Sequence, residues 1–476
     1  MERRMTLSGH VPSLSLIPLG TCHNGKYYID GECLGSDPIL INSQDQPSIL
    51  NSTIKLLAEL TTPLECLGMV GVATRSNQSS TATQQVVIYK LTQLLCNAKE
   101  SFLDGGGAML AVLRRVRHTL KNEPLSSDDN ISVNHSLLLI RNILHAPERP
   151  TQMADKRQDQ QDQLVRILLA QGLNRLLISL LACSQKDQWM VTVLQLISLL
   201  YKDRPVEIIL QLLDENCTHL EPEFYFDEQN QFGSKKSEKS LKKLSKYKLG
   251  RRVEMKGNVV EYKPTDESTL NLLKGFTINF IRQGYNTLVG QLHQQMLKQQ
   301  GDAHLQLLDK SHFLWLISYF LPIASRLELS VEHLKDVLTI DVLCYLTWEA
   351  VCQTEELEIY AFQHSTFDLK PCVRRLHLCV KAIREYLKTL ERFSRPSTSR
   401  NANAPKNFIT RLSGYVPAIR DLRQLFLLQL RQFDPVVQSR RYLLDVTRCY
   451  LLYVFRYSYV IMNYFFFLYY FSSLSR

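Results

Sequence analysis

The chain has 476 residues, of which 45% are hydrophobic and 21% charged. A single compact core rarely grows to this length, so two or more domains or an extended array of repeats is expected. The 11 cysteines are odd in number, spread from Cys22 to Cys449 and without a CxxC pair, which argues against a disulfide framework and indicates free thiols in a reducing compartment.

The net charge of +10 is concentrated in one segment. Residues 235–252 contain nine basic residues and one acid, a net charge of +8, whereas the rest of the chain holds 47 basic and 45 acidic residues. Such clusters are typical of nuclear import signals and nucleic-acid patches, and a merely solvated linker is the alternative. Tyr247 is the single aromatic residue of this run. Because bases of single-stranded nucleic acid stack on aromatic side chains, the run is poorly suited to bind them. We predict an import signal formed by Lys235, Lys236, Lys239, Lys242, Lys243, Lys246, Lys248, Arg251 and Arg252.

Residues 1–47 contain scattered Gly, Pro, Ser and Asn without periodicity, and we predict an irregular N-terminal segment. Its basic start is not followed by a continuous apolar run, so no signal peptide is expected.

Helical periodicity then extends over residues 48–204, with an apolar segment every 20 to 40 residues and short polar breaks between them. No strand-like alternation interrupts the series, which is typical of an α-solenoid whose helical units bury their faces on their neighbours. We predict a first helical-repeat block here. Its helices are expected within 47–67 (stopped at Pro63) and at 84–103, 108–120, 131–145, 162–184 and 188–202.

Residues 205–267 break this periodicity, with an acidic and aromatic stretch (214–231) before the basic run, and we predict a flexible linker. A second helical-repeat block is expected over 268–449. Its helices are predicted at 268–297, 311–329 (kinked or ended near Pro322), 331–358, 369–393 and 415–433.

The last segment, 450–476, has 12 aromatic residues between positions 450 and 471. Its length would permit a membrane span, but tyrosines throughout its centre are unlike a span, in which Tyr lies at the interfaces. We predict a tail that is not native to the fold, with a membrane anchor as the alternative.

The stretch SLLLIRNILHAPER (136–149) carries Arg141 and Asn142 within an apolar run. At helical spacing the two residues and His145 lie on one thin polar edge of an inner solenoid helix. Two interpretations of this edge stay open. It is either a solvated edge on which Asn142 caps a neighbouring carbonyl, or a surface for a partner.

Motifs of phosphate-binding loops, dinucleotide folds, serine hydrolases and zinc proteases are missing from the sequence. Cys372, His377 and Cys379 come close together, but without a second pair of ligands they do not indicate a metal site. We therefore predict a protein without catalytic, cofactor-binding or metal-binding residues.

SLLLIRNILHAPER resembles the (I/L)LL(I/V)RNILH(I/V)P run of the Timeless family. LLAELTTPLECL (56–67) and QWMVTVLQLISLLYKDR (188–204) are similar to the helices that flank this run in the family. Residues 308–351, 368–387 and 420–435 are similar to its circadian branch. The resemblance implies an all-α, armadillo/HEAT-like solenoid in two helical blocks joined by a basic linker. Because family members are much longer, it also implies an N-terminal portion.

The resemblance further implies a circadian clock scaffold in the nucleus, shuttling with the cytoplasm, that binds Period and supports repression of clock-driven transcription. An import receptor is an implied partner, and so is cryptochrome, although the element LGTCHNGKYYID (19–30) has Lys26 where an acid is usual. Neither sequence-specific nucleic-acid binding nor a membrane is expected. The alternative is the family's other branch, a replication-fork protection subunit that acts in the replication checkpoint and repair.

Overall fold

The structure is a computed structural model of the whole chain, and most of its residues are described. The described residues are 27–29, 32–34, 47–67, 82–103, 106–121, 124–148, 159–213, 250–254, 260–298, 310–327, 329–362, 369–394 and 406–458.

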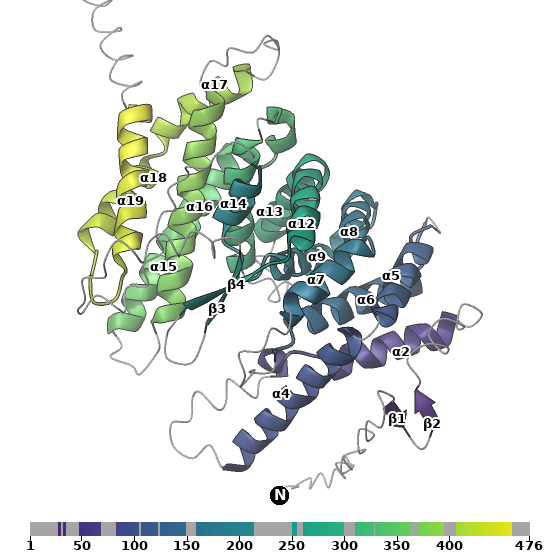
Figure 1. The fold of residues 1–476 in the computed structure, drawn as a ribbon. Coiled ribbons are helices and arrows are strands. Elements are labelled where there is room, and N and C mark those ends of the chain that lie inside the picture. Colours follow the sequence, from purple (N-terminus) through teal and green to yellow (C-terminus); the bar gives the residue numbers. More distant parts are fainter. Residues whose placement is uncertain are drawn as a thin grey trace, which may run out of the picture.

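The helices stack in two rows that run side by side along the molecule (Figure 1). Contacts between successive helices define the first row, which consists of α2 (Pro47–Leu60), α6 (Ser127–His145), α9 (Met190–Leu200), α14 (Lys310–Arg326), α16 (Lys370–Ser394) and α19 (Arg440–Leu452). The second row consists of α5 (Gly107–Thr119), α7 (Gln160–Ala170) with α8 (Leu173–Ala182), α12 (Glu267–Phe280) with α13 (Asn286–Lys298), α15 (Ile340–Phe362) and α18 (Arg420–Arg431). The predicted all-α solenoid is confirmed.

Three further helices and two small hairpins complete the described part. These are α4 (Ala82–Leu103), α10 (Val206–Leu213), α17 (Lys406–Tyr415), β1 (Tyr27–Ile29) paired with β2 (Glu32–Leu34), and β3 (Gly250–Glu254) paired with β4 (Val260–Pro264). Both hairpins are antiparallel. The predicted irregular segment 1–47 therefore contains one short hairpin, and its other residues before Pro47 lie outside the described ones.

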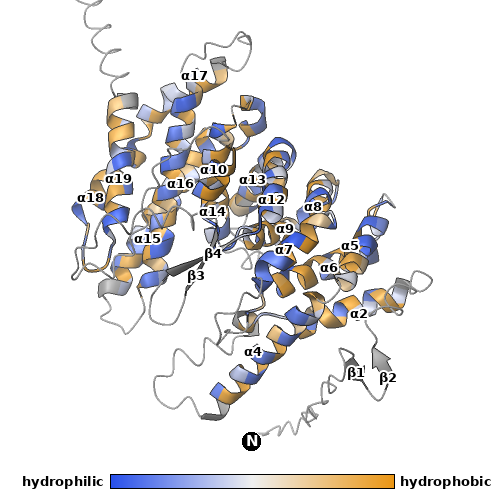
Figure 2. Cartoon of the chain, viewed as in Figure 1, coloured by the Kyte–Doolittle hydropathy of each residue, from blue (hydrophilic) through white to orange (hydrophobic). Residues whose placement is uncertain are grey.

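One continuous apolar core runs between the two rows, from Leu50 on α2 to Tyr453 after α19. Most helices carry both hydrophilic and hydrophobic stretches (Figure 2), as expected when each helix buries one side on its neighbours. None of the described helices is by itself long and apolar enough to cross a membrane; α7 and α8, bent by 61°, meet the length and composition criteria only as a pair.

The stack does not stop at the predicted linker. Residues 206–213 form α10, which packs on α12 and α14, while α12 packs on α7 and α14 on α9. The linker prediction was wrong for these residues, because VEIILQLL is apolar enough to be buried in the stack. It was also wrong for 250–254 and 260–264, which pair as the β3–β4 hairpin, whereas 214–249 and 255–259 lie outside the described residues.

Three predicted helices are interrupted. The helix expected at 331–358 consists of a 3₁₀ turn at Val331–Leu334 followed by α15, which begins at Ile340. The helix expected at 162–184 breaks at Gly172, whose φ of +87° ends α7 and begins α8. The helix expected at 268–297 contains a π-turn over Ile281–Tyr285. Pro322, by contrast, lies inside α14 without ending it.

The fold also reaches into the predicted foreign tail. Helix α19 ends at Leu452 and a π-turn continues over Tyr453–Ser458. Tyr453 is 1% exposed, and its hydroxyl donates to the carbonyl of Pro417 over 3.1 Å. The boundary predicted at residue 450 was therefore wrong, and the remainder of the tail, 459–476, lies outside the described residues.

Candidate functional site: helix α6 and its neighbours

Helix α6 begins with a capping box. The Ser126 hydroxyl accepts a hydrogen bond from the Asp129 amide over 3.1 Å, and the Asp129 carboxylate accepts one from the Ser126 amide over 3.3 Å. Because this box satisfies two amides of the first turn, the helix starts at Ser127, four residues before the predicted position.

Asn142 is buried, with 2% of its surface exposed. Its Nδ2 donates to the carbonyl of Ala58 over 2.8 Å and lies 3.5 Å from Thr61 Oγ1. Ala58 belongs to the last turn of α2, where backbone carbonyls have no partner within the helix. Asn142 therefore caps a neighbouring carbonyl, as one interpretation held, but it does so inside the protein and not on a solvated edge.

Arg141 is half-buried and connects α6 to α9. Its Nε and Nη2 donate to Asn142 Oδ1 over 3.1 and 2.7 Å, and its Nη1 donates to Gln195 Oε1 over 3.0 Å. Burial lowers the pKa of the guanidinium, while nearby Cys66 raises it; an arginine still stays charged. The Arg141–Asn142 pair thus connects three successive helices of the first row, α2, α6 and α9, and fixes their relative positions.

The C-terminal end of α6 is held by a buried lysine. Lys99 of α4 is 1% exposed, and its Nζ donates to the Ala146 carbonyl over 2.9 Å and to Gln161 Oε1 over 2.7 Å, with Glu148 Oε1 at 3.8 Å. Sequence reasoning missed Lys99; the signal was a lone lysine in the apolar second half of its helix. His145 lies half-buried in the last turn of α6 beside this contact.

A second buried polar cluster joins α16 to α19. Arg384 donates to Asp445 through Nη1 and to Glu385 through Nε (2.7 Å to Oε1), and His377 Nε2 lies 2.9 Å from Asp445 Oδ2. Burial opposes ionisation of Asp445, but the hydrogen bond from His377 and the charges of Arg384 and Arg441 outweigh it and lower the pKa of the carboxyl. His377 is thus engaged with a carboxylate, and no group of three His, Cys, Asp or Glu in the described part of the chain could hold a metal ion.

Of the predicted import residues, two are described. Arg251 and Arg252 lie on β3, opposite Lys263 and Tyr262 of β4. The other seven, from Lys235 to Lys248, lie outside the described residues.

The helices joined by the Arg141–Asn142 pair lie within a stretch of sequence that matches a known protein family. A sequence model of the family described as Timeless protein matches residues 37–260, which include α2, α6 and α9. The chain also aligns with the mouse "Protein timeless homolog" over 466 residues at 24% identity, covering 86% of this chain. Residues 37–260 of this chain belong to the Timeless family.

Two further Timeless proteins are more similar over a shorter stretch. "Protein timeless" of Drosophila melanogaster and that of Drosophila hydei are each 42% identical over 211 residues, 44% of this chain. The chain spans 14% of the length of the Drosophila melanogaster relative, 30% of the Drosophila hydei relative and 36% of the mouse relative.

The polar groups of the Timeless run in α6 are thus used to hold helices together. Arg141 and Asn142 reach three helices, and Lys99 closes the end of the run. These contacts join α2, α4, α6 and α9 into a rigid support.

Proposed function

We propose that this Timeless chain is a non-enzymatic circadian scaffold. It binds a Period-type protein, supports Period's nuclear entry and the repression of clock-driven transcription, and shuttles between nucleus and cytoplasm. The observation that carries the proposal is the difference in identity between relatives, 42% with the two Drosophila "Protein timeless" sequences against 24% with the mouse "Protein timeless homolog", although the latter alignment is longer.

The fold supports a scaffold role. An uninterrupted stack of helices offers long surfaces on both rows, and solenoids bind other proteins along such surfaces. The basic run 235–252 supplies the charge that an import receptor requires. A cryptochrome is a further proposed partner, through the N-terminal region that contains the β1–β2 hairpin.

A replication-fork protection subunit is the second candidate. It is favoured by the extent of the mammalian alignments, which cover 86% of this chain for both the mouse and the human "Protein timeless homolog", against 44% for the Drosophila proteins.

The test is a pull-down with the full chain as bait, from nuclear and cytoplasmic lysates sampled across a light–dark cycle and read by mass spectrometry. Empty beads and an unrelated helical-repeat bait serve as controls. A Period-type protein whose recovery changes with time of day supports the clock role. Replication proteins that follow S phase and ignore light would overturn it and establish the second candidate.

A further inference from the structure

Helices α18 and α19 form the last helical pair in the described part of the stack. Helix α18 packs on α15 and α19, and α19 packs on α16. The sides that make these contacts are buried, through Leu422, Leu425 and Phe426 on α18 and through Tyr442 and Val446 on α19. Within the described residues, the opposite sides of both helices are covered by no further layer of the stack.

Large apolar side chains are exposed on these opposite sides. On α19 and the turn after it, Leu444, Leu451 and Phe455 are 47%, 43% and 71% exposed. Their spacing of seven and four residues places them on one stripe of the helix. On α18, Leu427 and Leu428 are 43% and 36% exposed. Exposed apolar stripes on two adjacent helices are typical of a protein interaction site.

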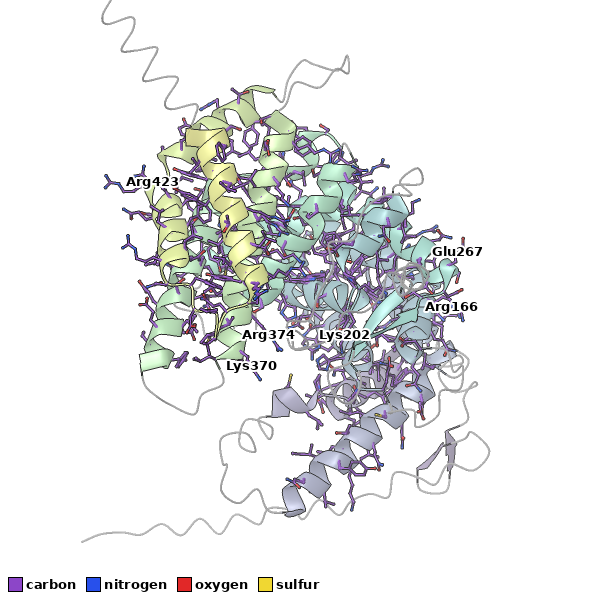
Figure 3. The ribbon with its side chains drawn as sticks, turned by 60° about the vertical axis from the view of Figure 1, so that its left-hand side comes forward. Arg166, Lys202, Glu267, Lys370, Arg374 and Arg423 are labelled. Carbon is purple, nitrogen blue, oxygen red and sulfur yellow. The ribbon has the colours of Figure 1, made fainter. Side chains whose placement is uncertain are left out.

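The same face is basic. Arg420, Arg423 and Arg431 are exposed on α18 and Arg440 on α19, with Asp421 as the exposed acid on these two helices. Figure 3 shows Arg423 pointing away from the body of the protein. The buried Asp445 is already paired with Arg384 on the inner side and so does not neutralise this face.

We propose that the face formed by α18 and α19 binds an acidic amphipathic helix of a partner protein. Two packed helices leave a groove between them that accepts a third helix, whose apolar side would cover Leu427, Leu444 and Leu451. Acidic residues flanking that apolar side meet the arginines at the rim, where complementary charge selects the partner and steers association.

Charge and apolarity together favour this occupant over others. A second copy of the chain would place arginines against arginines, because a two-fold contact pairs the same surface with itself. Nucleic-acid phosphates would match the arginines but would leave the exposed leucines and Phe455 without an apolar partner. The inference rests on this face alone and is independent of the proposed clock role.

The experiment uses the full chain and two labelled synthetic helices that share one Leu/Ile stripe, flanked by Glu in one peptide and by Lys in the other. Fluorescence anisotropy is expected to show that the Glu-flanked peptide binds at least about tenfold more tightly, with an affinity that falls as salt rises. The charge-reversed variant Arg423→Glu/Arg431→Glu is expected to prefer the Lys-flanked peptide. Leu444→Gln/Leu451→Gln is expected to weaken both.

The matched control is Arg175→Glu/Lys202→Glu, which reverses two exposed charges in the first half of the stack. It should keep the wild-type preference, and circular dichroism checks that every variant folds. Equal binding of the two peptides by the wild-type chain would overturn the proposal, as would equal loss in the control variant. So would displacement of the Glu-flanked peptide by anionic lipid vesicles or duplex DNA at lower concentration, or self-association of the chain through this face.

Discussion

Three buried polar side chains in this protein each hydrogen-bond a backbone carbonyl at the C-terminal end of a helix or in the turn that follows it. Asn142 binds the carbonyl of Ala58, Lys99 that of Ala146 and Arg204 that of Leu200. The last carbonyls of a helix have no partner within it, and the tight turns of a solenoid bury many of these ends. At these three ends a polar side chain therefore replaces water.

Replacing Asn142 by Ala removes a buried cap. The substitution leaves two donors of Arg141 without their acceptor. It also removes the shortest hydrogen bond to the Ala58 carbonyl, which keeps only the longer ones from the Thr61 and Thr62 hydroxyls, so we expect the free energy of unfolding to fall by about 2–3 kcal/mol. Urea denaturation of the full chain measures it. Asn134→Ala is the matched control, because Asn134 is half-buried on the same helix, and about 0.5 kcal/mol or less is expected for it.

The same pair of variants separates structure from partner binding. If Asn142→Ala left stability unchanged while the chain lost a partner in the pull-down, the residue would be a contact for that partner and its structural role would be wrong. We expect the reverse, a loss of binding only in proportion to the loss of folded protein.

Sequence reasoning reached part of this site. It identified the polar edge of Arg141 and Asn142 and the idea of a carbonyl cap, because periodicity reports which residues share a side of a helix. It could not identify Ala58 as the acceptor or Lys99 as a member, because both contacts join residues more than 45 positions apart. Such pairings depend on how helices stack, which periodicity does not contain.

At the scale of elements, the joint between the two predicted blocks is as well packed as the blocks themselves. The Tyr201 hydroxyl lies 2.6 Å from Thr277 Oγ1 of α12, and the Tyr319 hydroxyl of α14 donates to the Arg204 carbonyl over 3.1 Å. Arg204 is 2% exposed and forms an ion pair with Asp162 of α7. Four helices therefore meet at one turn, and the two halves are expected to unfold together.

The Arg204–Asp162 pair tests that expectation. Arg204→Met leaves a buried carboxylate unpaired and is expected to cost about 3–5 kcal/mol, whereas the double variant Arg204→Met/Asp162→Leu should cost clearly less than the two single variants together. Hydrogen exchange should show increased opening in both α7 and α14 for Arg204→Met. Opening confined to one side of the turn would indicate two independently folding blocks.

His293 makes the packing of α13 against α14 and α15 sensitive to acid. It is 7% exposed, and its ring lies 6.4 Å from that of Phe313 and 5.7 Å from that of Tyr345. Burial lowers its pKa below the ordinary 6.5, and the nearby Asp341 partly opposes this shift. The folded chain therefore binds the proton less tightly than the unfolded chain. Its stability is complete above 6.5 and falls as the pH drops from there toward the folded-state pKa.

The measurement is urea denaturation at about pH 7.5 and about pH 5.5. His293→Gln is expected to reduce the pH dependence, leaving the contribution of His135, whose pKa is also lowered by burial and by Lys55. An unchanged pH dependence in His293→Gln would show that folding does not shift the pKa of this histidine.

Most elements could be predicted from sequence, and the breaks between them could not. Apolar periodicity located most helices of both blocks, but it missed α17 and α19. Gly172 and the π-turn at Ile281–Tyr285 divide two of the helices that it located. At Gly284, inside that π-turn, an added Cβ would lie 2.8 Å from Leu181 of α8. Glycine is therefore required at this position because α8 packs closely against the π-turn. This contact joins residues far apart in the sequence, so the local sequence does not reveal it.

At the scale of the whole molecule, most of the net positive charge lies in one segment between the helices and not on the helices themselves. The stack is nearly neutral, whereas residues 235–252 carry +8 and interrupt the chain between two helices, α10 and α12, that pack on each other. A basic insertion at such a point can be altered without changing the core, so its function can be tested apart from folding.

Replacing Lys235, Lys236, Lys242 and Lys243 by Ala is therefore expected to shift a fluorescently tagged chain from nucleus to cytoplasm, with thermal unfolding unchanged. An import receptor recognises the positive charges, so the same four positions changed to Arg should keep the chain nuclear. Recovery of a Period-type protein from cytoplasmic lysate should be the same for both variants, which separates import from partner binding. A nuclear fraction unchanged by the four alanines would show that this run is a solvated insertion and that the chain enters the nucleus by another route.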